Sequence, residues 1–348
     1  LLKQQMDVVN SLPKEYVFLN YLRCHDDIGW GLDYDFLKPS GIQEIPHKKY
    51  LNEYFRGMAA GSDARGELYN DDPVLQDARL CGTTASLCGL EASLQAKDPA
   101  RIERAIQKIL MLNAYLFIQS GIPVIYSGDE IGQLNDYSYK DDPDADRAAD
   151  SRYVHRGHFR WELEKKRTEK GTVQNRIFEG MQKMEKARFA CGPFSGKAAV
   201  WTYDTYNSHV LCICRQLKNE MVVGVFNFSD EPQTAWIDMG EMPFQDLLGK
   251  GECVLRNIIL PGNGYGWYYK TWEEYIMKKY LMKIKVNMLI VLIISLLGGM
   301  AGSYFFNNRW LGLIVAIPLC ALYIYQVYQV QADYREQHTK KKHTNKYR

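Results

Sequence analysis

Three ionisable side chains stand side by side where an apolar run of the chain ends. The stretch "NYLRCHDDIGW" (20–30) begins with apolar and β-forming residues and then continues into His25, Asp26 and Asp27. Carboxylates and an imidazole in one short segment can give and take protons and stabilise charge, which are the tasks of general acid–base sites. This segment is therefore the first candidate for chemistry.

A second apolar run, 122–126, also ends in acids, at Asp129 and Glu130. If both runs are strands of one parallel sheet, their charged ends meet at the carboxyl edge, where (β/α) barrels and open α/β sheets build active sites. The alternative is a salt-bridged rim with no chemistry. The corresponding alternative for Asp129 and Glu130 is that they cap a helix or form a salt bridge. We expect Glu130 to have such a structural role and not a catalytic one.

The segments between and after these runs predict how they are positioned. Apolar residues recur at helical spacing over 99–119, so strand 16–23, this helix and strand 122–126 give the βαβ pattern of a parallel sheet. A further helix is predicted over 172–188. Short β-rich runs separated by Gly, Asn, Asp and Pro then predict a small antiparallel sandwich, and they lie at 198–203, 209–214, 221–228, 234–237 and 265–269.

Composition limits the classes of function. The 348 residues are 46% hydrophobic, and 43 Lys and Arg against 41 Asp and Glu leave a net charge of +2. The chain has no large excess of positive charge, which argues against nucleic acid as a partner. The 8 cysteines have no C-x-x-C spacing, so reduced core thiols of a cytoplasmic protein are expected, with a disulfide framework as the alternative.

Two uncharged runs near the end of the chain, 286–306 and 310–330, are each long enough to cross a membrane as a helix. Lysines precede the first run and a basic tail follows the second, which places both ends in the cytoplasm by the positive-inside tendency. The protein would then be cytoplasmic, attached to the inner face of the membrane through 286–330. Two buried core helices are the alternative. Met277 followed by two lysines also resembles the start of a separate small membrane protein, joined by a change of reading frame.

Four motifs resemble the carboxyl-terminal part of an amylosucrase, in the sucrose-using branch of the α-amylase superfamily (glycoside hydrolase family 13). They occur in the order of that family and are "LNYLRCHDDIGWG", "DARLCGTTASLCGLE", "GIPVIYSGDEIGQLNDYSY" and "ADSRYVHRGHFRW". The resemblance covers residues 1 to about 270. It implies a (β/α)8 (TIM) barrel followed by a β-sandwich, and retaining α-glucosyl transfer or hydrolysis on sucrose through a covalent glucosyl intermediate.

The resemblance assigns roles to five residues. Asp26 resembles the third catalytic carboxylate of the superfamily, which holds sugar hydroxyls as the ring approaches an oxocarbenium ion, and His25 would bind the same glucosyl unit. Asp27 and Arg79 resemble the ion pair that closes the floor of the pocket, and Arg156 resembles a rim arginine. Contacts that tighten in the transition state lower the barrier by several kcal/mol.

The chain also departs from the family. Retaining glycosidases use two carboxyl groups about 5 Å apart, and the R-x-D strand end that carries the nucleophile does not occur here. Strands one to six of the barrel are expected to be missing, and the first residues to be the helix before the seventh strand, with the start processed or absent. We therefore expect this chain not to turn over sucrose. The alternative function is a non-catalytic, membrane-tethered remnant that binds sugar through His25, Asp26 and the aromatic residues Trp30 and Tyr126.

The predicted fold class is α/β, with only the last strands of a barrel in 1–190, including an inserted loop region at about 30–95. A β-sandwich at 191–273 and a two-helix transmembrane hairpin in 277–348 follow. The expected partners are sucrose and an α-glucan acceptor. No cofactor and no metal are expected, because the acidic loop at 141–146 lacks the Gly and terminal Glu of a calcium loop.

Overall fold

The computed structural model describes residues 2–74 and 76–272, together with scattered positions between 289 and 328. Contacts within the chain divide it into a unit Leu1–Lys270 and a unit Thr271–Arg348. Among the described residues, no helix is long and apolar enough to cross a membrane. Most of the two predicted spans, 286–306 and 310–330, lies outside the described residues.

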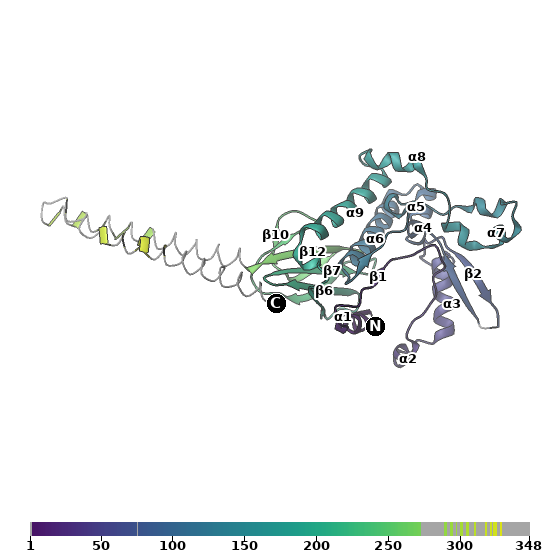
Figure 1. Ribbon diagram of the computed structural model, residues 1–348, viewed down its shortest axis with the longest axis horizontal. Helices are drawn as coiled ribbons and strands as arrows, with labels where there is room; N and C mark the ends of the chain where they lie inside the picture. The colour runs from purple at the N-terminus through teal and green to yellow at the C-terminus, as the bar shows by residue number, and fades with distance from the viewer. Residues whose placement is uncertain are drawn as a thin grey trace. The chain divides into compact units, whose positions relative to one another are not determined.

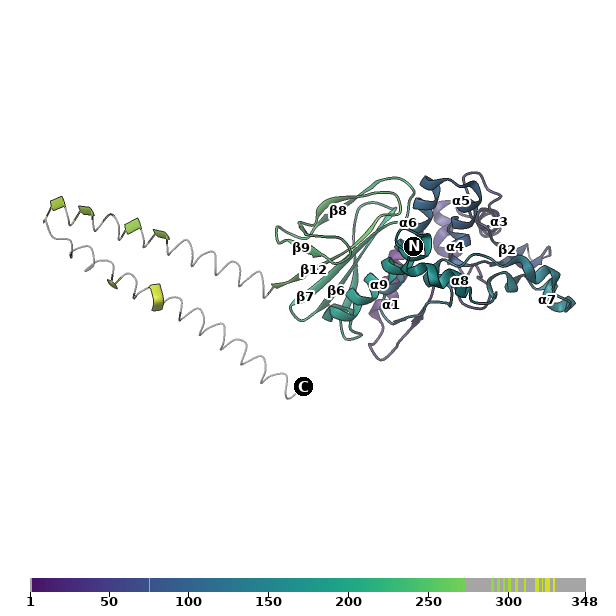
Figure 2. The same cartoon turned by 90° about the horizontal axis from the view of Figure 1, so that it is seen from above.

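The first unit is an α/β structure in which helices α6 and α9 lie between a β-rich part and a part rich in loops and short helices (Figures 1 and 2). Before α6 the elements are α1 (Leu2–Ser11), β1 (Leu19–Asn20), α2 (Tyr34–Leu37), η1 (Lys38–Ser40), α3 (Glu44–Phe55), β2 (Glu67–Asp72), β3 (Asp77–Cys81), α4 (Thr84–Leu87) and α5 (Leu90–Ala96). From α6 to the β-rich part they are α6 (Pro99–Ile118), β4 (Ile122–Pro123), η2 (Asp129–Ile131), η3 (Tyr137–Asp141), α7 (Ala145–Ala149), η4 (Ser151–His155), α8 (Trp161–Glu164), η5 (Lys165–Thr168), α9 (Val173–Ala190) and η6 (Gly192–Phe194).

Strands β1 and β4 pair in parallel, as predicted, in the register Leu19 with Ile122 and Asn20 with Pro123. The predicted lengths, 16–23 and 122–126, are wrong, because the ladder covers two residues of each strand. Pro123 has no N–H to donate, and the described residues place no further strand beside either partner. The two strands therefore mark an edge of parallel sheet, and a closed barrel is not present in the described chain.

The two long helices are close to the predicted ranges, and the sequence at their first turns explains where they begin. Asp98 caps α6 by accepting hydrogen bonds from the backbone N–H groups of Ala100 and Arg101, and Thr172 caps α9. The helices pack against each other and against α5 through a buried apolar cluster. Its members are Ala85, Leu90, Ala105, Ile106, Ile109, Ile177 and Met181.

The predicted antiparallel β unit is present. Its strands are β5 (Ala199–Tyr203), β6 (Val210–Leu217), β7 (Glu220–Asn227), β8 (Gln233–Asp238), β9 (Phe244–Asp246), β10 (Glu252–Cys253), β11 (Arg256–Leu260) and β12 (Tyr265–Thr271). One sheet has the order β10-β9-β12-β7-β6-β5, and β11 and β8 form a second. Because nearly every residue of β6 and β7 is buried, both faces of the large sheet are covered at these two central strands.

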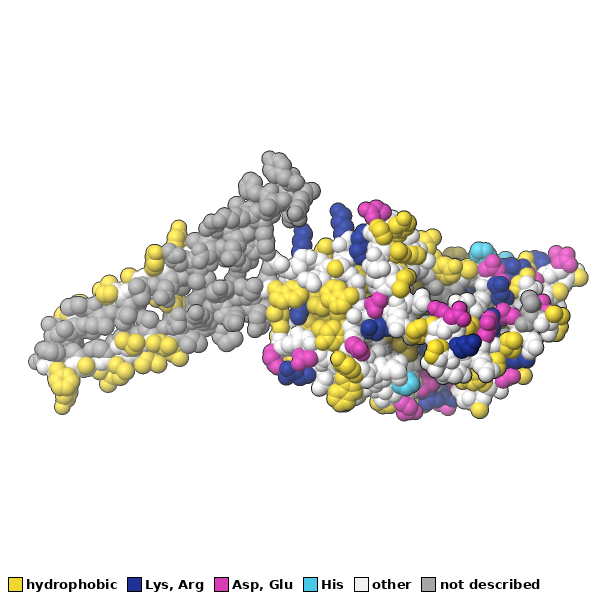
Figure 3. Space-filling model, turned by 90° about the horizontal axis from the view of Figure 1, so that it is seen from below, with side chains coloured by type: hydrophobic (Ala, Val, Ile, Leu, Met, Phe, Trp, Pro, Cys, Tyr) yellow, Lys and Arg dark blue, Asp and Glu magenta, His cyan; other side chains and the backbone are white. Residues whose placement is uncertain are grey.

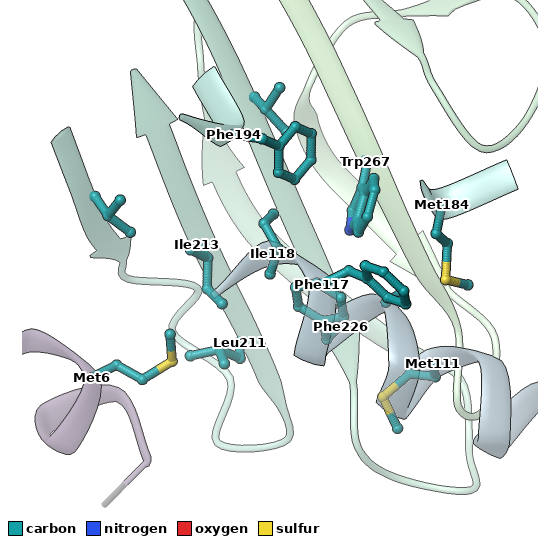
Figure 4. Packing of buried hydrophobic residues seen from close by; sticks show 13 residues of the cluster. Met6, Met111, Phe117, Ile118, Met184, Phe194, Leu211, Ile213, Phe226 and Trp267 are labelled. Carbon is teal, nitrogen blue, oxygen red and sulfur yellow. The ribbon is translucent and has the colours of Figure 1, made fainter. Parts of the chain in front are cut away.

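The core joins the β unit to the helices. Side chains on one face of the large sheet, including Phe226 and Trp267, pack against Phe117 and Ile118 of α6 and Met184 of α9 (Figure 4). The predicted boundary near residue 190 therefore does not separate two hydrophobic cores. The cysteines that the structure describes are free thiols, as expected. Acidic and basic side chains are interspersed on the face shown in Figure 3, in line with the near-balance of charge.

Candidate functional site

A buried ion pair links the loops that follow the two parallel strands. Arg23, just after β1, donates from Nη2 and Nε to Asp129 Oδ1 at 2.8 Å and 3.0 Å. Thr84 donates its hydroxyl to Asp129 Oδ2 at 2.9 Å, and the Tyr126 ring lies 4.4 Å from the Arg23 guanidinium. Burial raises the pKa of the Asp129 carboxyl, and Arg23 and Thr84 oppose that rise. The pair is closed to solvent, so it supports the site and does not face a ligand.

Asp26 is the exposed carboxylate in the segment His25, Asp26 and Asp27. Arg152 donates from Nη1 to Asp26 Oδ1 at 3.2 Å, and Arg156 Nη2 lies 4.0 Å from the same oxygen. The backbone N–H of Asp27, 3.0 Å from Oδ1, its side chain and Arg152 lower the pKa of Asp26 to about 2. Half of the Asp26 side chain is exposed, at 51%. Asp26 is therefore an ionised, oriented carboxylate at the surface.

Arg152 is itself held in place from two sides. Its Nε and Nη2 each donate to the Asp150 carboxylate at 2.9 Å, in the bidentate geometry that fixes a guanidinium. The Tyr69 ring lies 4.3 Å from the Arg152 guanidinium carbon. A cation on an aromatic face with two hydrogen bonds to a carboxylate loses little further freedom when it binds Asp26. The orientation of the Asp26 carboxylate thus depends on Arg152 and Asp150, which come more than a hundred positions later in the chain.

Asp27 and Arg79 form an ion pair, with Arg79 Nη1 3.1 Å from Asp27 Oδ2. Strand β3 carries Arg79 to this place, because Ile28 and Leu80 exchange backbone hydrogen bonds of 2.8 Å and 2.9 Å. The Asp27 side chain is 10% exposed and that of Arg79 is 55% exposed. The Arg79 side chain passes close to Gly29. A Cβ added to Gly29 would lie 3.2 Å from Arg79 Nη1. Their role as a pocket floor remains a prediction.

The backbone at His25 receives two hydrogen bonds. Arg156 donates from Nε to the His25 carbonyl at 2.5 Å, and Nε2 of His155 lies 3.3 Å from the same oxygen. Both bonds go to the backbone carbonyl, and the exposed His25 imidazole has no hydrogen-bond partner among the described residues. The structure therefore brings the five residues to which the resemblance assigns roles into one region, which we call the Asp26 cluster. They are His25, Asp26, Asp27, Arg79 and Arg156.

The sequence reasoning missed four residues that shape this cluster. They are Tyr69, Asp150, Arg152 and His155. Asp150, Arg152 and His155 lie within the motif "ADSRYVHRGHFRW", so the D-x-R spacing was a usable signal. Tyr126 stacks on Arg23. Trp30 donates to Asn52 at 2.7 Å and stacks on Phe55, so both predicted aromatic neighbours have packing partners of their own.

The acidic loop at 141–146 serves local structure. Asp144 caps α7 by accepting from the Asp146 backbone N–H, and Asp142 pairs with Arg147 at 3.4 Å. Within the described ranges no group of three or more His, Cys, Asp or Glu side chains is placed to hold a metal ion. A polar cleft of about 270 Å³ lies between α6 and the loop after β7, lined by residues such as Asp63 and Lys108, and the Asp26 cluster does not line it.

Comparisons with known proteins give structural neighbours, and no family model matches the chain. One neighbour is a variant of AmyP in complex with maltotriose, with 15% identity, a TM-score of 0.42, and coverage of 53% of this chain and 38% of AmyP. Another is an α-amylase from Anoxybacillus, with 17% identity, a TM-score of 0.36, and coverage of 53% and 35%. A third is the trehalulose synthase MutB from Pseudomonas mesoacidophila, with 16% identity, a TM-score of 0.35, and coverage of 47% and 38%.

These neighbours are α-amylase family enzymes. The chain spans between 35% and 38% of the length of the three.

Proposed function

We propose that residues 2–272 are the carboxyl-terminal part of an α-glucoside-processing enzyme that resembles an amylosucrase, and that the Asp26 cluster holds the glucosyl unit of sucrose. The observation that carries this proposal is the Asp26 carboxylate, which is exposed, ionised and held by Arg152 at the carboxyl ends of two parallel strands. An enzyme that forms an oxocarbenium-like ion needs such a negative group beside the ring.

The neighbouring residues fit supporting roles for the same sugar. The exposed His25 imidazole can donate to or accept from a ring hydroxyl, because the described residues leave both of its nitrogens without a hydrogen-bond partner. Arg79 and Asp27, already paired at 3.1 Å, would form the wall that limits the pocket to one glucosyl residue. Arg156 contacts the His25 carbonyl and approaches Asp26, so it would hold the segment and would not bind the sugar directly.

We expect this chain to bind sucrose and not to cleave it. Its 348 residues contain no R-x-D strand end of the type that carries the nucleophile. An α-glucan would be the acceptor in the complete reaction. The same missing motif favours the second candidate function, a non-catalytic sugar-binding protein, and release of fructose from sucrose by the purified chain would exclude that candidate.

The experiment is ligand-observed NMR of sucrose and of glucose with the purified chain and with Asp26→Asn. Removing one charge-assisted hydrogen bond of about 1.5–3 kcal/mol predicts a loss of roughly tenfold to a hundredfold in affinity. Asp238→Asn is the matched control, since Asp238 is an exposed aspartate paired with Arg256 at 3.1 Å on the β unit. Equal sucrose affinity in the two variants, or none in the parent chain, would refute the proposal.

A further inference from the structure

His155 is a buried histidine whose two ring nitrogens bond to two different loops. The Gly82 backbone N–H donates to Nδ1 at 3.0 Å, and Nε2 lies 3.3 Å from the His25 carbonyl oxygen. The side chain lies in η4, 73 residues after Gly82 and 130 residues after His25. It is 4% exposed. One imidazole therefore joins the loop after β1 to the residue that follows β3.

The hydrogen bonds decide which nitrogen carries the proton. A backbone N–H can only donate, so Nδ1 must be the unprotonated acceptor and the single ring proton is on Nε2. Nε2 then donates to the His25 carbonyl. Burial, with a smaller effect of the Arg23 charge, lowers the pKa of His155 to about 4, so the imidazole is neutral in the physiological range.

The two donors on the His25 carbonyl fix one peptide plane. Because Arg156 Nε also reaches this oxygen, at 2.5 Å, the peptide between His25 and Asp26 is held from two directions. That peptide sets where the Asp26 backbone begins and how its carboxylate meets Arg152. Gly82 directly follows β3, the strand that carries Arg79, so the same imidazole also ties the Asp27–Arg79 pair to this segment.

We propose that His155 is a positioning residue, which orients the His25–Asp26 peptide so that the His25 imidazole and the Asp26 carboxylate face the same glucosyl unit. This inference rests on the proposed function for its ligand and on the two hydrogen bonds for its geometry.

Two conservative substitutions separate the two hydrogen bonds. His155→Gln places an amide N–H near the position of Nε2 and keeps a donor for the His25 carbonyl. His155→Asn places an amide oxygen near Nδ1 and keeps only the acceptor for Gly82. We expect sucrose affinity within about threefold of the parent for His155→Gln and about tenfold weaker for His155→Asn, the effect of one hydrogen bond. A purely structural role predicts that affinity follows the unfolding temperature of each variant, whichever nitrogen is replaced.

A second readout does not need a sugar. In the His155→Asn chain, the amide resonance of Asp26 and the carbon-13 titration of its carboxylate should shift from their parent values, and in His155→Gln they should stay close to them. If the parent chain binds no sucrose, the proposed function is refuted. The Asp26 resonances then still test whether His155 positions the His25–Asp26 peptide. Parent-like Asp26 resonances in His155→Asn, or equal affinity in both variants, would overturn the inference.

Arg156→Lys keeps the test decisive if the buried substitutions prevent folding, because it removes the Nε donor and retains the positive charge that lies 4.0 Å from Asp26. Arg156 is 21% exposed and supplies the other donor to the His25 carbonyl. If that carbonyl controls Asp26, this variant moves the Asp26 carboxylate resonance in a folded chain. An unchanged resonance would count against the proposal.

Discussion

Asp129→Asn should be among the most destabilising conservative changes in the chain. The substitution keeps the size and shape of the side chain and removes its charge, so the Arg23 guanidinium is left buried without a counter-ion. The side chains of the pair are 3% and 6% exposed, and Arg23 makes three hydrogen bonds to the carboxylate. Breaking a buried pair from one side costs about 3–5 kcal/mol. That is a large part of the ~5–15 kcal/mol that stabilises a typical domain.

The assay is urea unfolding at pH 7, followed by circular dichroism, with the parent, Asp129→Asn and Asp238→Asn side by side. Asp238 pairs with Arg256 on the surface, with 56% and 50% of the two side chains exposed. That control should lose less than about 1 kcal/mol. If Asp129→Asn costs no more than the control, the pair does not hold the two loops together.

A double substitution separates the value of the pair from the cost of breaking it. Replacing both partners with apolar side chains, as in Arg23→Met with Asp129→Leu, leaves no uncompensated charge. Such replacements are often neutral or stabilising, so the double variant should be more stable than Asp129→Asn. Thr84 loses its acceptor in the double variant, which limits the recovery by about 1 kcal/mol. A double variant no more stable than Asp129→Asn would contradict this account.

Three further predictions concern the strands, the β unit and pH. Gly121→Ala should lower the free energy of unfolding by about 1–3 kcal/mol, because Gly121 has a φ of +113° and an added Cβ would lie 2.3 Å from the Phe18 oxygen. The Ile122 amide, which donates to that oxygen, should then exchange its hydrogen faster. Arg215→Met should cost roughly 3 kcal/mol in urea unfolding, because the guanidinium, 1% exposed, donates to four backbone carbonyls. Asp26 has a pKa of about 2 in the folded chain against 3.8 ordinarily, so its contribution to stability is present above pH 3.8 and is lost as pH falls toward 2. The acid-induced fall in unfolding temperature over that window should be smaller in Asp26→Asn, and identical curves would contradict the assigned pKa.

The sequence was sufficient to predict the elements whose signals are local. Helix α6 (Pro99–Ile118) was found because apolar residues recur at helical spacing over 99–119. The β-rich runs after residue 198 were found from their β-forming residues and from the Gly, Asn, Asp and Pro between them. Strands β1 and β4 were predicted too long, because strand length depends on a neighbouring strand, and Tyr16 and Val17 pair with none in the described chain.

In the candidate site, too, the sequence predicted the residues that are close in the chain and missed the partners that are distant in it. His25, Asp26 and Asp27 are adjacent in the sequence and were found as a group. Their partners are not local, since Arg152 binds Asp26 across 126 positions and His155 binds Gly82 across 73. A buried histidine with two backbone partners has no local pattern, because its importance comes from the loops it joins. Only the three-dimensional structure identifies such residues.

Burial divides the cluster into residues that support it and residues that can meet a ligand. Arg23, Asp129 and His155 are each less than a tenth exposed, whereas Asp26 is exposed. Supports that are locked by packing and hydrogen bonds hold a surface carboxylate in one geometry before any ligand arrives, which reduces the entropy lost on binding. Substitutions should therefore fall into two classes. Asp129→Asn should lower the free energy of unfolding strongly, and Asp26→Asn should lower it less, by the contribution that the ionised carboxylate makes above pH 3.8, while weakening sucrose binding. If both variants lost stability and affinity in proportion, the cluster would be a structural rim of the fold, and the salt-bridged alternative would be the correct one.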